Sequence, residues 1–188
     1  MSDSGGGSGT DTTECPPGVP VQPRAEVRVT APAQEVPEFR AAVEQMPGLL
    51  AALQAAPSLR VADHPQIPKA PGIYLFSEAA RPIYVGQSRN LRNRLRQHTG
   101  ERSRENAASF AFNIAKREAT LAGVEVNGWR AVLEADPAFV PHFSQARASV
   151  AAMTVQFIEL EDPVVRTLFE VYVALALGLH EFNSFETH

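Results

Sequence analysis

Three short runs of β-prone residues stand out from the pattern of hydrophobic and polar positions. Gly72–Phe76 and Ile83–Gly86 are separated by Ser77–Pro82, which has the composition of a turn. Two such runs joined by a short turn predict an antiparallel hairpin. Polar and apolar residues alternate over most of Thr154–Leu160, which predicts a third strand. The sheet is therefore expected to be small, three-stranded and largely antiparallel.

Helical patterns surround these runs. Glu38–Leu53 predicts one or two short helices, because Pro47 breaks or restarts the pattern. Asn90 is a suitable N-cap for a helix over Leu91–His98, and Gly100 is placed to end that helix.

Later segments continue the helical pattern. A second helix is expected over Asn106–Leu121, where one stripe carries Ala108, Phe112, Ala115 and Ala119. Residues 129–152 have the composition of mixed helix and loop.

The last helix has clear boundaries in the sequence. Asp162 and Pro163 form a strong helix start, and Gly178 is a natural stop after about Leu177. The order β-β-α-α-(α)-β-α predicts an α+β fold, with a small three-stranded sheet flanked by helices.

Composition divides the chain into three parts. Residues 1–33 are rich in Gly, Ser, Thr and Pro and offer little to bury, which predicts a disordered or extended tail. Residues 34–68 are expected to form a short helical extension, and residues 69–188 a globular domain. The start of the chain has no pattern of a secretory signal.

Cysteine content and hydropathy indicate a cytoplasmic protein without a membrane partner. Cys15, the single cysteine, excludes an internal disulfide framework and fits a reducing compartment. The most apolar run, Leu168–Leu179, is too short to span a bilayer and is interrupted by Glu170.

The charge distribution is uneven. A net charge of −4 argues mildly against nucleic-acid binding, yet Arg81–Arg104 holds seven arginines and one acid, Glu101. Such a local basic face can bind nucleic acid on an acidic protein. The alternative is a solvated helix face.

A helical wheel sorts these arginines into two groups. Arg94 and His98 share the face that carries the leucines toward the sheet, whereas Arg89, Arg92 and Arg96 point outward. A cation on the protein side needs a partner, and a bound phosphate would supply one. Outward arginines can contact other backbone phosphates. The alternative is that Arg94 pairs with a structural carboxylate and that His98 is an ordinary histidine at the edge of the helix.

Glu170 is unusual in its apolar run. A carboxylate among such neighbours is costly to bury unless it is paired or bound to a metal. The alternatives are that Glu170 lies at an exposed edge of the helix, or that it pairs with Arg166 four residues before it.

These motifs together resemble those of the GIY-YIG nucleases, the domain type of the N-terminal part of the excision-repair subunit UvrC and of several homing and restriction endonucleases. The resemblance covers about Pro71–Asn183 and is densest over Pro71–His98. Its six elements, in chain order, are Gly72-Ile73-Tyr74, Tyr84-Val85-Gly86, Arg94, His98, Glu170 and Asn183. Gln87 departs from it, because UvrC-type members have a lysine there.

The resemblance implies a metal-dependent endonuclease that hydrolyses phosphodiester bonds, in DNA more than in RNA. Glu170 would hold one Mg²⁺ or Mn²⁺. The implied catalytic set is Tyr74, which orients water and takes its proton, Tyr84, Arg94, which stabilises transition-state charge, His98 and Asn183. The implied nucleic-acid contacts are Arg89, Arg92, Arg96 and Gln87.

Other interpretations remain open at this point. Tyr74 and Tyr84 could be half-buried aromatics of the strands, which is the ordinary role of a single strand tyrosine. The same scaffold could serve as a non-catalytic module that binds nucleic acid or a protein. Targeting could come from a homodimer, from a partner protein or from the insertion between residues 123 and 153.

Overall fold

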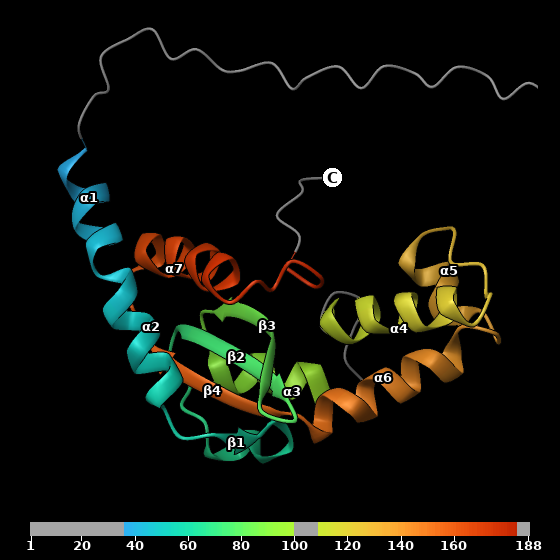
Figure 1. Ribbon diagram of the computed structural model, residues 1–188. Helices are drawn as coiled ribbons and strands as arrows, with labels where there is room; N and C mark the ends of the chain where they lie inside the picture. Colours follow the sequence, from blue (N-terminus) through green and yellow to red (C-terminus); the bar gives the residue numbers. More distant parts are fainter. Residues whose placement is uncertain (1–35, 100–108, 184–188) are drawn as a thin grey trace, which may run out of the picture. The chain divides into compact units, whose positions relative to one another are not determined.

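The computed structural model describes residues 36–99 and 109–183 (Figure 1). The expected tail, the end of a helix at Gly100 and the start of the next helix at Asn106–Ala108 lie outside the described residues. Residues from Val36 onward belong to one compact unit, so the segment before residue 69 shares its packing with the rest.

One antiparallel sheet forms the centre of the fold. Its four strands are β1 (Leu59–Arg60), β2 (Gly72–Glu78), β3 (Arg81–Ser88) and β4 (Thr154–Glu159), in the spatial order β1-β4-β2-β3. Every pairing is antiparallel. The α+β class and the three expected strands are confirmed. The expected strand number was one too low, because β1 has only two residues and shows no alternating pattern.

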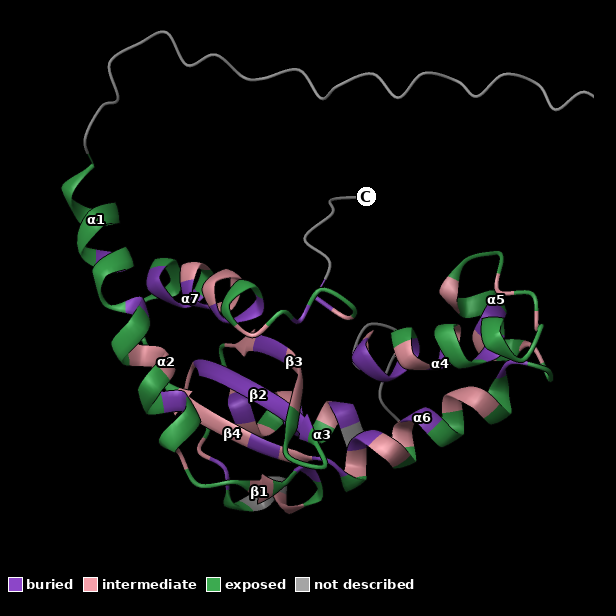
Figure 2. Ribbon diagram, in the orientation of Figure 1, coloured by how far each residue is buried: buried purple, intermediate pink, exposed green. Residues whose placement is uncertain are grey.

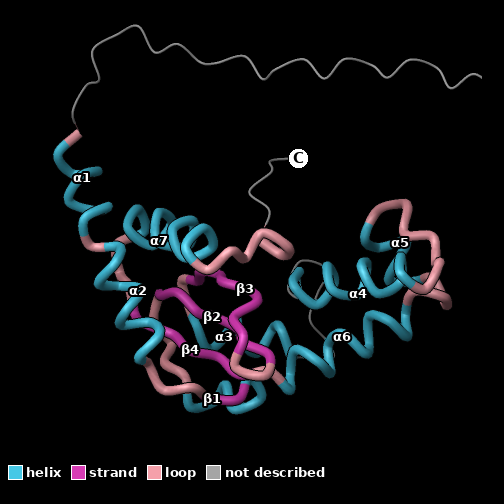
Figure 3. Tube along the Cα trace, in the orientation of Figure 1, coloured by secondary structure: helices cyan, strands magenta, loops and turns pink. Residues whose placement is uncertain are grey.

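Helices surround the sheet (Figure 3). They are α1 (Pro37–Glu44), α2 (Met46–Ala55), the 3-10 helix η1 (Val61–Gln66), α3 (Leu91–Thr99), α4 (Ser109–Leu121), α5 (Arg130–Ala135), α6 (Val140–Ala152) and α7 (Pro163–Ala176). The expected break at Pro47 is confirmed, because that residue lies in the first turn of α2. The expected caps are also confirmed: Asn90 accepts from the Asn93 amide, and Asp162 accepts from the first amides of α7.

The sheet separates two hydrophobic cores. Tyr74 and Phe76 of β2 face a core shared with α3, α4 and α6. Ile73 and Leu75 face a second core shared with α1, α2 and α7. Six of the seven residues of β2 are buried, because this central strand is covered on both faces (Figure 2). Alternation along β2 therefore sorts side chains between two cores, not between core and solvent.

The turn of the β2–β3 hairpin is unusual. Ala79 and Ala80 both have left-handed backbones, with φ of 46° and 65°. Two-residue hairpin turns of this kind ordinarily use Asn or Gly, because a Cβ is unfavourable at positive φ. Just before this turn, the pairing register of β2 with β3 shifts between Phe76 and Ser77. The hydrogen bonds between β2 and β3 and the packing of their side chains therefore stabilise the hairpin, whereas the turn residues do not.

Glycine substitutions test how closely the sheet packs. A Cβ at Gly72 would collide with the backbone carbonyl of Ile158 and would lie 2.9 Å from Leu91 Cδ1, whereas a Cβ at Gly48 in α2 would meet open space. Gly72→Ala should lower the free energy of unfolding by about 3 kcal/mol, because backbone cannot easily move aside. Gly48→Ala should raise it by about 0.5–1 kcal/mol through helix propensity.

Urea denaturation of both variants checks this prediction. The two glycine-to-alanine changes serve as controls for each other. Equal effects in the two variants would contradict the packing that the structure gives to Gly72.

Candidate active site at the edge of strand β3

A close approach between Tyr74 and Gly86 places a phenol at the edge of the sheet. The two residues are register partners on β2 and β3. A Cβ on Gly86 would collide with the phenol oxygen of Tyr74, so the Tyr74 ring lies over the glycine. The hydroxyl therefore lies over β3, the edge strand of the sheet, while Tyr74 itself is fully buried.

Helix α3 presents two polar groups to this hydroxyl. Arg94 Nε donates to Tyr74 Oη at 3.2 Å, and His98 Nε2 lies 3.0 Å from the same oxygen. Leu91 and Leu95, on the same face, are buried in the core. The expectation that Arg94 and His98 share the face turned toward the sheet is confirmed. Arg94 Nη2 also donates to Ser109 Oγ of α4 at 3.2 Å, a contact that no sequence pattern predicts.

His98 is a neutral imidazole. Burial, and next the nearby Arg94 charge, lower its pKa from 6.5 to about 3. Its Nδ1 has no hydrogen-bond partner among the described residues. A buried N–H without an acceptor costs about 1–3 kcal/mol, so a proton on Nε2 is the less costly tautomer. In that tautomer the Tyr74 oxygen accepts from both Arg94 and His98.

Tyr84 lies beside Tyr74 on the same face of the sheet. Its ring stacks on Phe110 of α4, with centroids 4.3 Å apart and planes 9° apart. Burial raises the pKa of Tyr84, and it raises the pKa of Tyr74 well above the usual value. Both phenols are therefore protonated at neutral pH.

Glu170 approaches from the opposite face, on α7. It is half-buried, and burial raises its pKa while hydrogen bonds from Gln87 oppose the rise. Gln87 Nε2 donates to Glu170 Oε2 at 2.8 Å and to Thr167 Oγ1 at 3.3 Å. The positive charge of Arg94 also lowers the pKa of Glu170, although less than the hydrogen bonds from Gln87 do. The site thus straddles β3, with phenols on one side and a carboxylate on the other.

Arg166 does not form the alternative pair with Glu170. Its Nε donates to Gln87 Oε1 at 3.2 Å, and its Nη1 donates to the backbone carbonyls of Leu160 and Glu161. Gln87 was expected to contact nucleic acid, but both ends of its amide are occupied between Arg166 and Glu170. Because Arg166 can only donate, the Gln87 amino group must face Glu170.

Asn183 contacts backbone, not the phenols. Val85 N donates to its Oδ1 at 3.1 Å, and its Nδ2 donates to Val85 O at 2.7 Å. The side-chain amide thereby imitates a further strand on the open edge of β3. These contacts suit a residue that positions β3 next to Tyr84 and Gly86.

The three arginines expected to point outward differ from one another. Arg89 is exposed, and exposed Arg96 donates to Asn93 Oδ1 at 2.9 Å. Arg92 departs from the expectation. It is half-buried, and its Nε donates to Ile67 O at 2.6 Å, which holds the side chain against the segment after η1.

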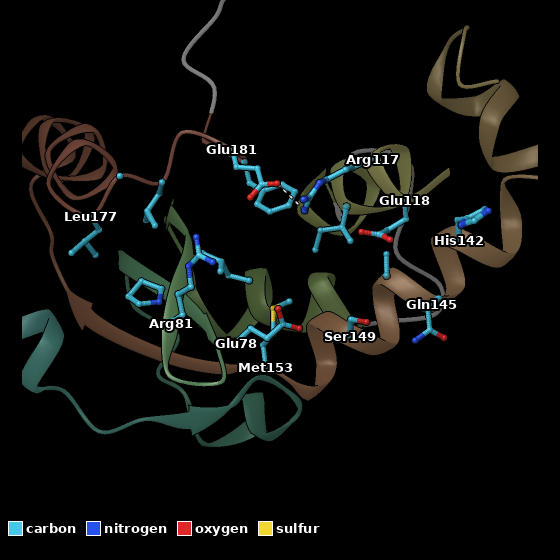
Figure 4. A pocket seen from close by; sticks show the side chains of 17 residues that line it. Glu78, Arg81, Arg117, Glu118, His142, Gln145, Ser149, Met153, Leu177 and Glu181 are labelled. Carbon is cyan, nitrogen blue, oxygen red and sulfur yellow. Dashed lines mark ion pairs between the residues drawn. The ribbon is translucent and has the colours of Figure 1, made fainter. Parts of the chain in front are cut away.

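A cavity of about 670 Å³ lies away from these residues (Figure 4). Its walls come from the β2–β3 turn, α4, α6 and the segment after α7. Arg117 and Glu181 form an ion pair of 2.7 Å at its border, and acids and bases are mixed along its lining. None of the sequence-predicted site residues lines it.

The carboxylate at the β3 edge can hold a hard cation. Among the described residues no three His, Cys, Asp or Glu side chains cluster together, which argues against an all-protein metal cage there. Mg²⁺ commonly binds one or two carboxylates and keeps several waters. A single carboxylate with one oxygen fixed by Gln87 fits that coordination.

Within the described part of the chain, no helix is long and apolar enough to cross a membrane.

Comparison with known proteins points to one family. Residues 70–135 match the model of the UvrC-like GIY-YIG domain. A stretch of 31 residues is 55% identical to UvrABC system protein C of Aquifex aeolicus and covers 16% of this chain and 6% of that protein. A stretch of 36 residues is 47% identical to the same protein of Deinococcus radiodurans and covers 19% and 6%. The match thus spans only a small part of these relatives.

A solved structure was also found, the GIY-YIG N-terminal endonuclease domain of UvrC from Thermotoga maritima, as a point mutant bound to the catalytic divalent cation. Its TM-score is 0.34 at 14% identity, over 73% of this chain and 96% of that one.

Tyr74, Tyr84, Arg94 and His98 lie inside the matched segment, whereas Glu170 and Asn183 lie beyond it. Their presence at the β3 edge comes from the fold. Residues 70–135 are therefore similar to the UvrC-like GIY-YIG domain.

Proposed function

We propose that this protein is a divalent-metal-dependent endonuclease that hydrolyses phosphodiester bonds in DNA. The observation that carries the proposal is the convergence on one phenol. Arg94 and His98 both contact the Tyr74 hydroxyl, at a sheet edge that Glu170 approaches from the other side. The match of residues 70–135 to the UvrC-like GIY-YIG domain supports the same chemistry.

Glu170 would hold the cation, with Mg²⁺ or Mn²⁺ as the candidates. When bound, such an ion supplies positive charge to a phosphate oxygen and to the leaving oxygen. Gln87 fixes one carboxylate oxygen through its amino group, and Arg166 fixes Gln87 in turn. The carboxylate is thereby oriented before any ligand arrives, which lowers the entropy cost of binding.

Arg94 stabilises negative charge on the phosphate in the transition state. A guanidinium is always protonated and presents its donors in a rigid plane. Tyr74 and Ser109 each accept from Arg94 and so fix that plane. Donors held in place before the reaction contribute most to transition-state stabilisation.

Tyr74 orients the attacking water and receives its proton. A phenol buried this deeply is protonated at neutral pH, so Tyr74 can act as a base only after it has released its own proton to solvent; the proton that it then takes from the attacking water restores the phenol. Donation from Arg94 and from His98 Nε2 to the same oxygen stabilises the resulting phenolate. Tyr84, stacked on Phe110, restricts where water and phosphate can lie beside Tyr74.

Cleavage assays test the site. Supercoiled plasmid, branched DNA and structured RNA are incubated with Mg²⁺ or Mn²⁺. Arg94→Ala and Glu170→Ala should each lower the cleavage rate by at least about 100-fold, because each removes a charge that acts in the transition state. Chelation with EDTA should abolish cutting.

Two exposed residues away from the site give matched controls. Arg60→Ala on β1 and Glu38→Ala on α1 make the same chemical changes and should leave the rate unchanged. Cutting that persists in both site variants would place the reaction elsewhere. Binding to DNA without cutting of any substrate would favour the non-catalytic module.

A second prediction concerns the neutral state of His98. Because the pKa of His98 falls from 6.5 unfolded to about 3 folded, only the unfolded chain takes up this proton between these values. The stability that neutral His98 contributes is fully present above pH 6.5 and is lost as the pH falls toward 3. Between pH 7.5 and pH 5 the loss attributable to His98 should be about 2 kcal/mol.

Urea denaturation at the two pH values measures this loss. His98→Phe should remove most of the difference, whereas exposed His180→Gln should retain it. The same pH dependence in wild type and His98→Phe would show that the buried imidazole is not neutral.

A further inference from the structure

A second cavity, of about 320 Å³, is lined in part by Gln87, the residue that also donates a hydrogen bond to Glu170. It is lined by Gln87, Ser88, Arg89, Pro163, Arg166 and Thr167. The lining contains two guanidinium groups and no carboxylate. A concave surface with two positive charges and only neutral polar neighbours favours an anion.

Arg166 is a buried cation with neutral partners. Only 5% of the residue is exposed, and the acceptors of its guanidinium are two backbone carbonyls and the Gln87 amide oxygen. Among the described residues no carboxylate lies within ion-pair distance of it, and Glu170 is reached only through Gln87. Buried charges are normally paired with an opposite charge, and the described residues provide no negatively charged partner for Arg166.

Arg89 supplies the second charge. It is exposed immediately after β3, and within the described residues its side chain makes no hydrogen bond or ion pair. The hydroxyls of Ser88 and Thr167 are both engaged with backbone carbonyls, and the Gln87 amide is engaged at both ends. The two arginines are therefore the groups that can bind an incoming anion.

The cavity lies one helical turn from the carboxylate of Glu170. Thr167 and Glu170 are three residues apart on α7, and Gln87 contacts both. Side chains at this spacing are about 5–6 Å apart at Cβ. An anion in the cavity would thus lie next to the phosphate that is cleaved, on the same side of β3 as Glu170.

We infer that this cavity is a subsite for a nucleic-acid backbone phosphate adjacent to the scissile one, bound by Arg89 and Arg166. This inference rests on the proposed nuclease function. The sequence suggested Gln87 as a phosphate contact, but Gln87 orients Glu170. We assign the contact to Arg166 instead, because the bound phosphate would supply the negative charge that this buried cation lacks. The subsite would fix the position of the strand so that the scissile phosphate meets Glu170 and Arg94.

Charge changes at two exposed positions test the subsite without disturbing the buried Arg166. Arg89→Gln removes one cation. Thr167→Asp places a carboxylate in the cavity, where it would neutralise Arg166. Thr120→Asp on α4 adds the same carboxylate at an exposed position outside the cavity, and Arg60→Gln on β1 removes a distant exposed cation, so these two variants are the matched controls.

Affinity for a fluorescein-labelled DNA oligonucleotide is measured by anisotropy in metal-free buffer over a range of salt concentrations. Arg89→Gln should raise Kd about tenfold and lower the salt slope by about one phosphate contact. Thr167→Asp should weaken binding at least as much, while both controls stay within about twofold of wild type. Equal Kd values and salt slopes in all five proteins would overturn the subsite.

Thermal denaturation with inorganic phosphate gives a readout that does not depend on nucleic acid. Phosphate should raise the Tm of wild type and not that of Thr167→Asp, which should already melt at a higher temperature because its own carboxylate pairs with Arg166. An equal phosphate effect in both proteins would also overturn the subsite.

The two proposals fail in different ways. If no substrate is cut but the variants differ as described, the phosphate subsite stands and the nuclease function falls. If DNA is cut and the variants bind alike, the nuclease function stands and the subsite falls.

Discussion

The burial of one hydroxyl group organises the candidate site. Tyr74 is fully enclosed, and an enclosed phenol oxygen without partners would cost free energy that a small domain can hardly spare. Helix α3 meets this requirement with Arg94 and His98, one turn apart, while two leucines of the same helix fill the core. A rotation of α3 by one residue would remove both polar partners at once. The requirement for packing and the requirement for chemistry therefore select the same orientation of the helix.

The edge position of β3 explains how groups from both faces of the sheet meet. Gly86 lets the Tyr74 ring lie across the strand, and Gln87, the next residue, turns toward α7 and Glu170. An interior strand could not do this, because neighbouring strands would separate the two faces. An open edge also invites unwanted pairing with other chains. Asn183 answers this by occupying both backbone groups of Val85.

Local features of the fold were predictable from the sequence, because short-range rules determine them. The hairpin, the cap at Asn90 and the helix start at Asp162 depend on residues within a few positions of one another. That Arg94 and His98 lie on the same face of α3 also followed from helical spacing alone. Strand β1 escaped prediction, since two residues carry no period and only its pairing with β4 defines it.

The partners of long polar side chains could not be predicted in the same way. Gln87 meets Arg166 and Glu170 across about eighty positions of sequence, and Asn183 meets Val85 across 98. Arg92 looked like an outward cation on a helical wheel, but the segment after η1 folds beneath it. These contacts arise from how distant elements dock, and helical or strand periodicity holds no information about docking.

The alanine turn between β2 and β3 has a consequence for the order of folding. Two residues at positive φ each oppose the hairpin by about 1–2 kcal/mol, so the hairpin gains little from its own turn. Its register must come from packing on β4, which lies far along the chain and pairs with the other edge of β2. Contacts of such long sequence separation slow folding. The folding nucleus is therefore expected to include β4 with β2, and the β3 edge of the sheet is expected to form last.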